Sequence, residues 1–310
     1  MPVAVGIDLG GTKIAGLRMD ESGEVLARDE APTPADADAI LDELVRLVKE
    51  LAGGDAGAVG VGAAGMVEFD AGTLRFSPNL PLRDIPLRQL IEERCGLPCL
   101  VDNDANAAGW GEYRFGAAAD HRNVLLVTVG TGIGGALVID GQLYRGAHGF
   151  AAEIGHIIVE PDGPECGCGN RGCWEQVASG QALERLGRAE ADRAPDGAIA
   201  RAARGREVRG EQVSEAARAG DAAARGVFEE VGRRLGEGIA GLVNVLDPEL
   251  VVVGGGMGEE GDLLLEPARR AFSQTVEAVD RRPEVPILMA VLGNEAGAVG
   301  AAAMALELTP

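Results

Sequence analysis

The sequence predicts an α/β protein built from two similar domains that face each other across a cleft. Its length of 310 residues corresponds to about two domains of ordinary size. Short apolar runs that end at glycine are typical of buried strands, and they alternate here with stretches of helical periodicity. In addition, one pattern of strand, glycine-rich turn and strand occurs twice, at an offset of 120 residues.

The repeat aligns residues 8–12 with residues 128–132. In that register Gly10, Leu17 and Asp20 fall on Gly130, Leu137 and Asp140. Because glycine-rich turns recur in many folds, chance similarity between two hairpins is the alternative to a true repeat.

The first part of the chain is expected to alternate strands and helices. Residues 3–8 form an apolar run closed by glycines, which is typical of a buried strand. Residues 36–51 carry apolar side chains at helical spacing and end at Gly53, as a helix should. By the same reasoning we expect strands at 14–19, 24–27, 58–63 and 99–101, a turn at 21–23, and helices at 87–95 and 105–113.

A new set of strands is expected to begin the second part. Residues 124–129 and 136–139 are predicted strands, and Asp140 with Gly141 is typical of a hairpin turn. The chain from Gln176 to about Val245 is predicted to be mostly helical. Short buried strands are expected at 250–253 and 287–291, and residues 296–306 are expected to close the chain as a helix.

The composition excludes several classes of partner. The chain has 28 Lys and Arg against 49 Asp and Glu, a net charge of −21, so no basic stripe is available for nucleic acid or an anionic membrane. No apolar run reaches the ~18 residues of a membrane span, and the N-terminus lacks the basic region of a signal peptide. We therefore expect a reducing, cytoplasmic location, in which the five cysteines are thiols or metal ligands.

The first glycine-rich loop, residues 8–13, is a candidate phosphate site. Glycine lets backbone N–H groups approach phosphate oxygens, while Thr12 and Lys13 add a hydroxyl and a cation. Asp8 is suited to hold Mg²⁺ through water, since hard cations prefer carboxylate oxygen. A plain hairpin turn is the alternative interpretation.

The second loop, residues 130–135, matches the spacing G-x-G-x-x-G. We reject an NAD site, because that fingerprint must open a helix and residues 136–139 are predicted to be a strand. A second phosphate-binding hairpin fits better. A third strand–glycine turn contains Gly255 and Gly256, where a flat adenosine could lie against the backbone; an ordinary strand-to-helix turn is the alternative.

Four potential metal ligands are closely spaced: His156, Cys166, Cys168 and Cys173. One imidazole and three thiolates make the closed tetrahedral site that is typical of structural Zn²⁺. With four protein ligands no position is left for water, so this zinc is expected to shape the protein and not to react. The alternative is a set of unrelated thiols. Cys95 and Cys99 are expected to be small buried hydrophobic residues.

A polar cluster follows the predicted strand at 99–101: Asp102, Asn103, Asp104 and Asn106. Helix N-capping explains one of these residues and hardly all four. A carboxylate at a cleft can instead take a proton from a substrate hydroxyl as a general base. Glu153 and Glu175 flank the metal ligands, so a bound metal would orient both. Carboxylates and amides suit a polyol, because each sugar hydroxyl both donates and accepts.

Together these motifs resemble the ROK family of sugar kinases and repressors. The resemblance covers essentially the whole chain and rests on residues 8–13, 103–108, 130–134, 153–156 and 166–175. Within the family, residues 77–80, 110–113, 162–163 and 292–297 are similar to those of actinobacterial glucokinases.

The resemblance implies an actin-like, hexokinase-like (ribonuclease H-like) fold, with one α/β domain at 1–117 plus 296–310 and a larger one, carrying the zinc loop, at 118–295. It implies that Asp104 takes the proton of the glucose 6-hydroxyl as this attacks the γ-phosphate of ATP, giving glucose 6-phosphate. The implied sugar ligands are Asn79, Asn103, Glu153, His156 and Glu175. The implied Mg²⁺ and phosphate residues are Asp8, Gly10, Gly11, Thr12, Lys13, Gly130, Thr131, Gly132 and Gly134, with Gly255 and Gly256 facing adenosine. Family members are usually homodimers or homotetramers.

Other activities stay open. The sugar could be N-acetylglucosamine, N-acetylmannosamine, mannose or fructose, and polyphosphate could replace ATP, although the sequence shows no long basic track for a polymer. A sugar-responsive repressor of the family would carry a helix-turn-helix domain ahead of the first loop. Seven residues precede Asp8, and the charge of −21 disfavours DNA, so a kinase is expected.

Overall fold

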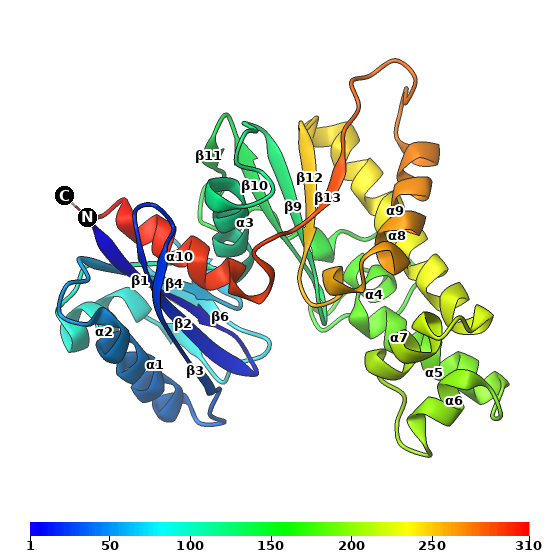
Figure 1. Cartoon of the computed structure of the whole chain (residues 1–310), viewed down its shortest axis with the longest axis horizontal. Coiled ribbons are helices and arrows are strands. Elements are labelled where there is room, and N and C mark those ends of the chain that lie inside the picture. The colour runs from blue at the N-terminus through cyan, green and yellow to red at the C-terminus, as the bar shows by residue number, and fades with distance from the viewer. Residues whose placement is uncertain (310) are drawn as a thin grey trace. The chain divides into compact units, whose positions relative to one another are not determined.

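The computed structural model describes residues 1–309, and the chain divides into two compact units (Figure 1). Unit 1 contains Met1–Leu126, Gly135–Ala152 and the chain from Ala290 on, and unit 2 contains Val127–Gly134 and Glu153–Met289. Among residues 1–309 no helix is both long enough and apolar enough to cross a membrane.

Unit 1 is centred on a five-stranded sheet of order β3-β2-β1-β4-β8. Its strands are β1 (Val3–Leu9), β2 (Lys13–Asp20), β3 (Val25–Pro32), β4 (Ala58–Ala63) and β8 (Cys99–Asn103). The first three strands are antiparallel, whereas β1, β4 and β8 run parallel to one another. The carboxyl ends of these three parallel strands therefore lie at one edge of the sheet, where ligands bind in open α/β sheets.

The alternation of side chains along β1 decides which helices cover each face of this sheet. Val5, Ile7 and Leu9 belong to the core that also contains the apolar side of helix α1 (Ala37–Ala52) and helix α2 (Leu87–Cys95). On the other face, a Cβ atom at Gly6 would collide with the backbone of helix α10 (Ala296–Leu306). Small residues on this face thus let α10 approach the sheet closely, next to helix α3 (Asp104–Phe115).

A small second sheet in unit 1 was not expected from the sequence. It consists of β5 (Met66–Glu68), β6 (Thr73–Phe76) and β7 (Arg83–Ile85), all antiparallel and only three or four residues long. Each strand is too short to show the period-two pattern that identifies a strand in sequence.

The third sheet has the order β11-β10-β9-β12-β13. Its strands are β9 (Val124–Val129), β10 (Ile133–Ile139), β11 (Gln142–Leu143), β12 (Leu250–Gly254) and β13 (Ile287–Met289). The chain passes from one unit to the other within β9 and again within β10. In this sheet, the strand expected at 287–291 is β13, which is two residues shorter, and the strand expected at 136–139 is β10, which begins three residues earlier.

The helical region expected from Gln176 to about Val245 is confirmed, but it is divided into five helices. They are α4 (Glu175–Ala178), α5 (Gly180–Arg193), α6 (Ala198–Ala203), α7 (Gly210–Arg218) and α8 (Ala222–Leu246). Helix α9 (Asp262–Thr275) was not expected, and it packs along α8. A Cβ atom at Gly232 of α8 would lie only 2.5 Å from the ring of Pro267 in α9. Glycine at this position therefore lets the two helices pack closely.

Candidate functional site

The polar cluster predicted after β8 forms the turn into α3. Asn103 is the N-cap of the helix: its side-chain oxygen accepts hydrogen bonds from the N–H groups of Ala105, at 2.8 Å, and Asn106, at 3.1 Å. Its amide nitrogen donates to the carbonyl oxygen of Gly65 at 3.0 Å. The turn therefore engages most of this amide, and one N–H donor of Asn103 is left over for a ligand.

Asp102 serves the same turn and is almost completely buried, with 1% of its surface exposed. It accepts hydrogen bonds from the N–H of Asn103 at 2.7 Å and the side-chain amide of Asn106 at 2.9 Å. It also forms an ion pair with Arg145, 2.6 Å away. These contacts explain three of the four polar residues as supports of the turn. The remaining one, Asp104, is the partly exposed first residue of α3.

Asp8 lies at the same edge of the sheet as this turn. In the strand register, Asp8 is paired with Gly62 on β4, and Gly62 with Asp102 on β8. A Cβ atom at Gly297, in the first turn of α10, would lie 2.8 Å from the Asp8 carboxylate, so the helix covers this side chain. Burial raises the pKa of Asp8 from 3.8 to about 6, and the charge of Lys13 partly opposes this shift.

The raised pKa of Asp8 predicts a stability effect. Above pH 6 the folded state must hold Asp8 ionised in a buried position, which lowers the free energy of unfolding. Asp8→Asn is therefore expected to be more stable than the wild type at pH 7.5, by roughly 1–3 kcal/mol. The difference should shrink as the pH falls from 6 toward 3.8, and vanish only well below pH 3.8, where Asp8 is protonated in both the folded and unfolded states. Denaturant unfolding without Mg²⁺ or nucleotide measures it. Equal stabilities at pH 7.5 would contradict the desolvation of this carboxylate.

The first glycine loop forms a closed turn between β1 and β2. The N–H of Gly10 donates to the carbonyl oxygen of Lys13 at 3.1 Å, and the Lys13 ammonium pairs with Glu30 at 2.9 Å on the surface. A Cβ atom at Gly11 would lie 2.8 Å from that of Asn79. The structure therefore brings Asn79, Asp8 and this loop together within unit 1, whereas sequence spacing alone leaves Asn79 isolated.

The second glycine loop is held in place within unit 2. The carbonyl oxygens of Gly130 and Thr131 accept hydrogen bonds from the N–H of Gly180, at 2.8 Å, and the hydroxyl of Ser179, at 2.9 Å. Strand β10 begins within this loop, at Ile133, which confirms that no helix opens here. Gly255 has a φ of +81° and lies against the backbone of Val129, a conformation and a distance that favour glycine.

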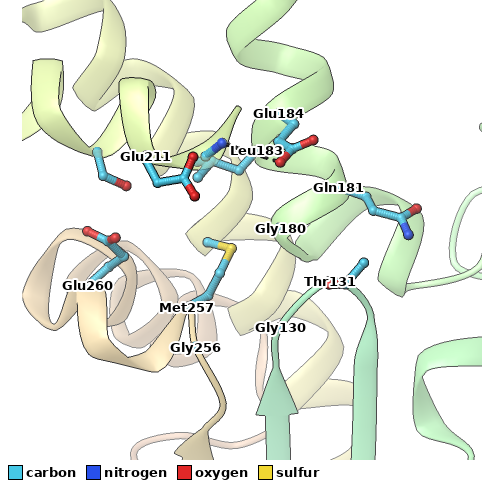
Figure 2. Close-up of a pocket in the computed structure, with 12 residues that line it drawn as sticks. Gly130, Thr131, Gly180, Gln181, Leu183, Glu184, Glu211, Gly256, Met257 and Glu260 are labelled. Carbon is cyan, nitrogen blue, oxygen red and sulfur yellow. Dashed lines mark hydrogen bonds between the residues drawn. The ribbon is translucent and has the colours of Figure 1, made fainter. Parts of the chain in front are cut away.

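A cavity of about 280 Å³ opens beside this loop (Figure 2). Its lining includes three of the residues predicted for nucleotide binding, namely Gly130, Thr131 and Gly256. The side chains of Glu211 and Glu260 lie on one side of it and that of Gln181 on another, as Figure 2 shows. The other lining residues are Gly180, Leu183, Glu184, Gly210, Ser214 and Met257.

The helical residues that line this cavity were not predicted from the sequence, because they belong to no recognisable motif. They come from α5, α7 and the 3₁₀ turn at Gly258–Glu260, which are far apart along the chain. The carboxylate of Glu260 is held by Arg218 at 2.8 Å. Gly132, Gly134 and Gly255 are not among the residues that line the cavity.

The four predicted metal ligands lie together, with their ligand atoms within 4.8 Å of one another. The sulfur atoms of Cys168 and Cys173 are 3.6 Å apart, and that of Cys166 is 3.7 Å from Nδ1 of His156. Zn–S bonds of about 2.3 Å at a tetrahedral ion place two sulfur atoms about 3.8 Å apart. The donor set and its spacing therefore fit zinc.

Glu153 and Glu175 accompany this cluster. Glu175 accepts a hydrogen bond from Sγ of Cys166 at 3.1 Å. A Cβ atom at Gly132 would collide with the Glu175 carboxylate, so this carboxylate packs directly against the second glycine loop. Burial raises the pKa of Glu153, while nearby His156 lowers it and Glu175 raises it. Nδ1 of His156 faces the thiols, so Nε2 is the ring nitrogen available to a second partner.

The predicted site residues therefore form two groups, each within one unit. Unit 1 holds Asp8, Gly10, Gly11, Thr12, Lys13, Asn79, Asn103 and Asp104. Unit 2 holds the metal cluster with Glu153 and Glu175, the second loop as far as Gly134, and Gly255 and Gly256. The functional candidate that sequence reasoning missed in unit 1 is Arg145, whose partner Asp102 is 43 residues away in the chain.

Comparison with known proteins agrees with the predicted resemblance. The ROK family model matches residues 4–308. A glucokinase from Streptomyces coelicolor is 44% identical over 315 residues, covering 100% of this chain and 99% of that protein. A crystal structure of a ROK family glucokinase from Streptomyces griseus, in complex with glucose and AMPPNP, is 44% identical with a TM-score of 0.90, covering 98% of this chain and 99% of that one.

A ROK hexokinase from Thermus thermophilus is 38% identical with a TM-score of 0.79, and 99% of each chain is covered. These likenesses confirm the predicted α/β fold class. The family model spans nearly the whole chain, and the match to the Streptomyces coelicolor protein covers all of it. The chain therefore belongs to the ROK family.

Proposed function

We propose that the protein is a glucokinase, which transfers the γ-phosphoryl group of ATP to the 6-hydroxyl of glucose. The observation that carries this proposal is the full-length likeness to a glucokinase that binds glucose and AMPPNP, at 44% identity and a TM-score of 0.90. The positions of the candidate residues support it, because carboxylates and glycine loops gather at the sheet edge of unit 1 and around the cavity of unit 2.

In unit 1, Asp104 is the proposed general base. It accepts the proton of the 6-hydroxyl, which makes that oxygen a better nucleophile toward the γ-phosphate. Asn103 fixes the start of α3 and has one N–H donor left for a sugar hydroxyl. Asn79, beside the first glycine loop, is the other proposed sugar ligand of this unit.

In unit 2, Glu153, Glu175 and Nε2 of His156 are the proposed ligands of the remaining sugar hydroxyls. Carboxylates accept hydrogen bonds from hydroxyl groups, and an imidazole nitrogen can donate or accept one. His156, Cys166, Cys168 and Cys173 would hold a zinc ion, which supplies rigidity to the loop between Glu153 and Glu175.

The nucleotide is proposed to occupy the cavity beside the second glycine loop. Its volume of about 280 Å³ is near the lower end of small-molecule sites, which are roughly 300–1,000 Å³. Gly255 and Gly256 would face adenosine, and Gly130, Thr131, Gly132 and Gly134 would serve its phosphates. In unit 1, Gly10, Gly11, Thr12 and Lys13 are proposed as phosphate ligands by the same chemistry. Asp8 would hold Mg²⁺, since its oxygen atoms suit a hard cation.

The wider organisation is part of the same proposal. We propose that the two compact units correspond to the two domains of a kinase, and that the enzyme is a homodimer or homotetramer in the cytoplasm. Thiols that bind metal are consistent with a reducing compartment.

A product assay tests the proposal directly. ATP and polyphosphate are each combined with glucose, mannose, fructose and N-acetylglucosamine, and the phosphorylated sugars are identified. We expect glucose 6-phosphate to form with ATP, and faster than any other product. If another sugar is phosphorylated faster, that sugar replaces glucose as the proposed substrate. If polyphosphate is preferred, it replaces ATP as the proposed donor. The absence of any phosphorylated sugar would refute the proposed kinase activity.

A further inference from the structure

Arg145 and Asp102 form an ion pair to which the proposed reaction assigns no role. The Nε atom of Arg145 lies 2.6 Å from the carboxylate, and the exposed fractions of the two side chains are 23% and 1%. Buried ion pairs add little net stability, because removing two charges from water costs about as much as their attraction returns. Such a pair does fix the relative orientation of the segments that carry its members.

On one side, the pair fixes the turn that presents Asp104. Asp102 accepts hydrogen bonds from the N–H of Asn103 and the amide of Asn106, the residues that stand directly before and two after Asp104. Arg145 binds the second oxygen of the same carboxylate. The orientation of Asp102, and through it the start of α3, therefore depends on the guanidinium group.

On the other side, the pair anchors the segment that leads to Glu153. The guanidinium group of Arg145 lies 3.9 Å from the ring centre of Phe69. The backbone carbonyl oxygen of Arg145 accepts a hydrogen bond from the backbone N–H of Ala151 at 3.1 Å. Gly149, with a φ of +92°, is seated against the small sheet, where a Cβ atom would lie 2.6 Å from the carbonyl oxygen of Val67. The segment is thus held at several points within unit 1.

The segment ends in a strained residue. Ala152, the last residue of unit 1 before Glu153, has a φ of +67°, in the left-handed region that favours glycine. A non-glycine residue keeps this conformation only where its surroundings impose it. The anchoring of residues 145–151 supplies that constraint, up to the residue directly before Glu153.

We propose that Arg145 and Asp102 are positioning residues for phosphoryl transfer. Together they orient the turn that carries the proposed base Asp104 and the segment that precedes the proposed sugar ligand Glu153. This inference rests on the proposed function, because it assigns those two residues to the reaction. It predicts that the pair controls turnover and sugar binding, and leaves nucleotide binding unaffected.

The test compares Arg145→Met, Arg145→Lys, Asp102→Asn and the Asp102→Asn/Arg145→Met double variant in steady-state kinetics. For Arg145→Met we expect kcat to fall about a hundredfold, as for a reacting group misplaced by about 1 Å. The glucose KM should rise, while the ATP KM should change less than about twofold. Arg145→Lys should recover part of the loss, because it keeps the charge, and the double variant should be no worse than Arg145→Met.

Glu112→Gln is the matched control. Glu112 is a carboxylate of α3 with the same exposure of 1%, and it accepts hydrogen bonds from the N–H groups of Leu292 and Ala117 at 2.8 and 2.9 Å. The Glu112→Gln variant is expected to have a lower melting temperature than the wild type, with unchanged kcat and unchanged KM values for glucose and ATP. If Arg145→Met behaves like this control, with wild-type kcat and glucose KM, the pair is only structural and the proposal is overturned.

Amide hydrogen exchange provides a readout that does not need activity. Arg145→Met should speed exchange at residues 103–106 and 145–152 selectively, whereas uniform acceleration, or none, would overturn the proposal. A wild type that phosphorylates no sugar would refute the proposed function instead, and exchange would still report on the coupling of the two segments. If Arg145→Met does not fold, Arg145→Lys and Asp102→Asn carry the same comparisons.

Discussion

Asp104→Asn is expected to lower kcat by at least about a hundredfold while the protein stays folded. A positioned general base contributes about 10²–10⁴-fold to the rate, and asparagine has the same shape but cannot take up the proton of the sugar hydroxyl. Asp104 is the first residue of α3, so its charge also interacts with the helix N-terminus. That interaction is worth only about 0.3–1 kcal/mol, so the loss of the base dominates.

Asp38→Asn separates the two effects. Asp38 is the acidic residue in the first turn of α1, and it is exposed. Its replacement removes the same kind of helix-terminal charge, and it should leave kcat unchanged. Glucose affinity, measured by calorimetry, should change little in Asp104→Asn, since an amide still accepts a hydrogen bond. Near-normal turnover of Asp104→Asn would remove Asp104 from the role of base.

The sequence predicted those parts of the fold whose pattern is local. The strand at 58–63 and the helix at 296–306 have the predicted bounds, because uninterrupted apolar runs between turn residues determine both. The two copies of the repeat are confirmed as strand–turn–strand units, with Gly10 between β1 and β2 and Gly130 between β9 and β10. The predicted resemblance to the ROK family is likewise confirmed.

Elements whose stability comes from distant partners were missed. The strands β5, β6 and β7 are short. They exist because they pair with one another, and the segment that contains Gly149 packs against them. Helix α9 contains Pro267, a residue that normally ends a helix, and glycines of α8 make room for it. Neither compensation is visible within a local window of sequence.

The candidate site shows the same division. The four metal ligands lie within 18 residues of the chain, and the prediction that they gather is confirmed by the structure. Arg145 belongs to no motif, and the role proposed for it follows only from its contact with Asp102, 43 residues earlier. The carboxylates around the cavity come from separate helices, so no spacing rule could have grouped Glu184, Glu211 and Glu260. The roles of the individual residues stay predictions.

Cys168→Ser is expected to remove zinc from the protein and to weaken glucose binding by about tenfold or more. A serine hydroxyl is a poor replacement for a thiolate ligand, and structural zinc contributes on the order of 10 kcal/mol to the folding of the segment that binds it. Glu175 follows Cys173 by two residues, so loss of the ion should loosen the segment that carries this carboxylate. Metal analysis and calorimetric titration with glucose measure the two effects.

Cys95→Ser provides the control, because Cys95 is a half-buried thiol outside the cluster. This variant should keep one zinc ion per chain and the affinity of the wild type for glucose. The cavity proposed for the nucleotide is lined by none of the four metal ligands, so nucleotide binding by Cys168→Ser should change much less than glucose binding. A zinc-free Cys168→Ser with normal glucose affinity would show that the metal loop does not orient the sugar ligands. The prediction for Asp104, which depends on the separate turn into α3, would then still stand.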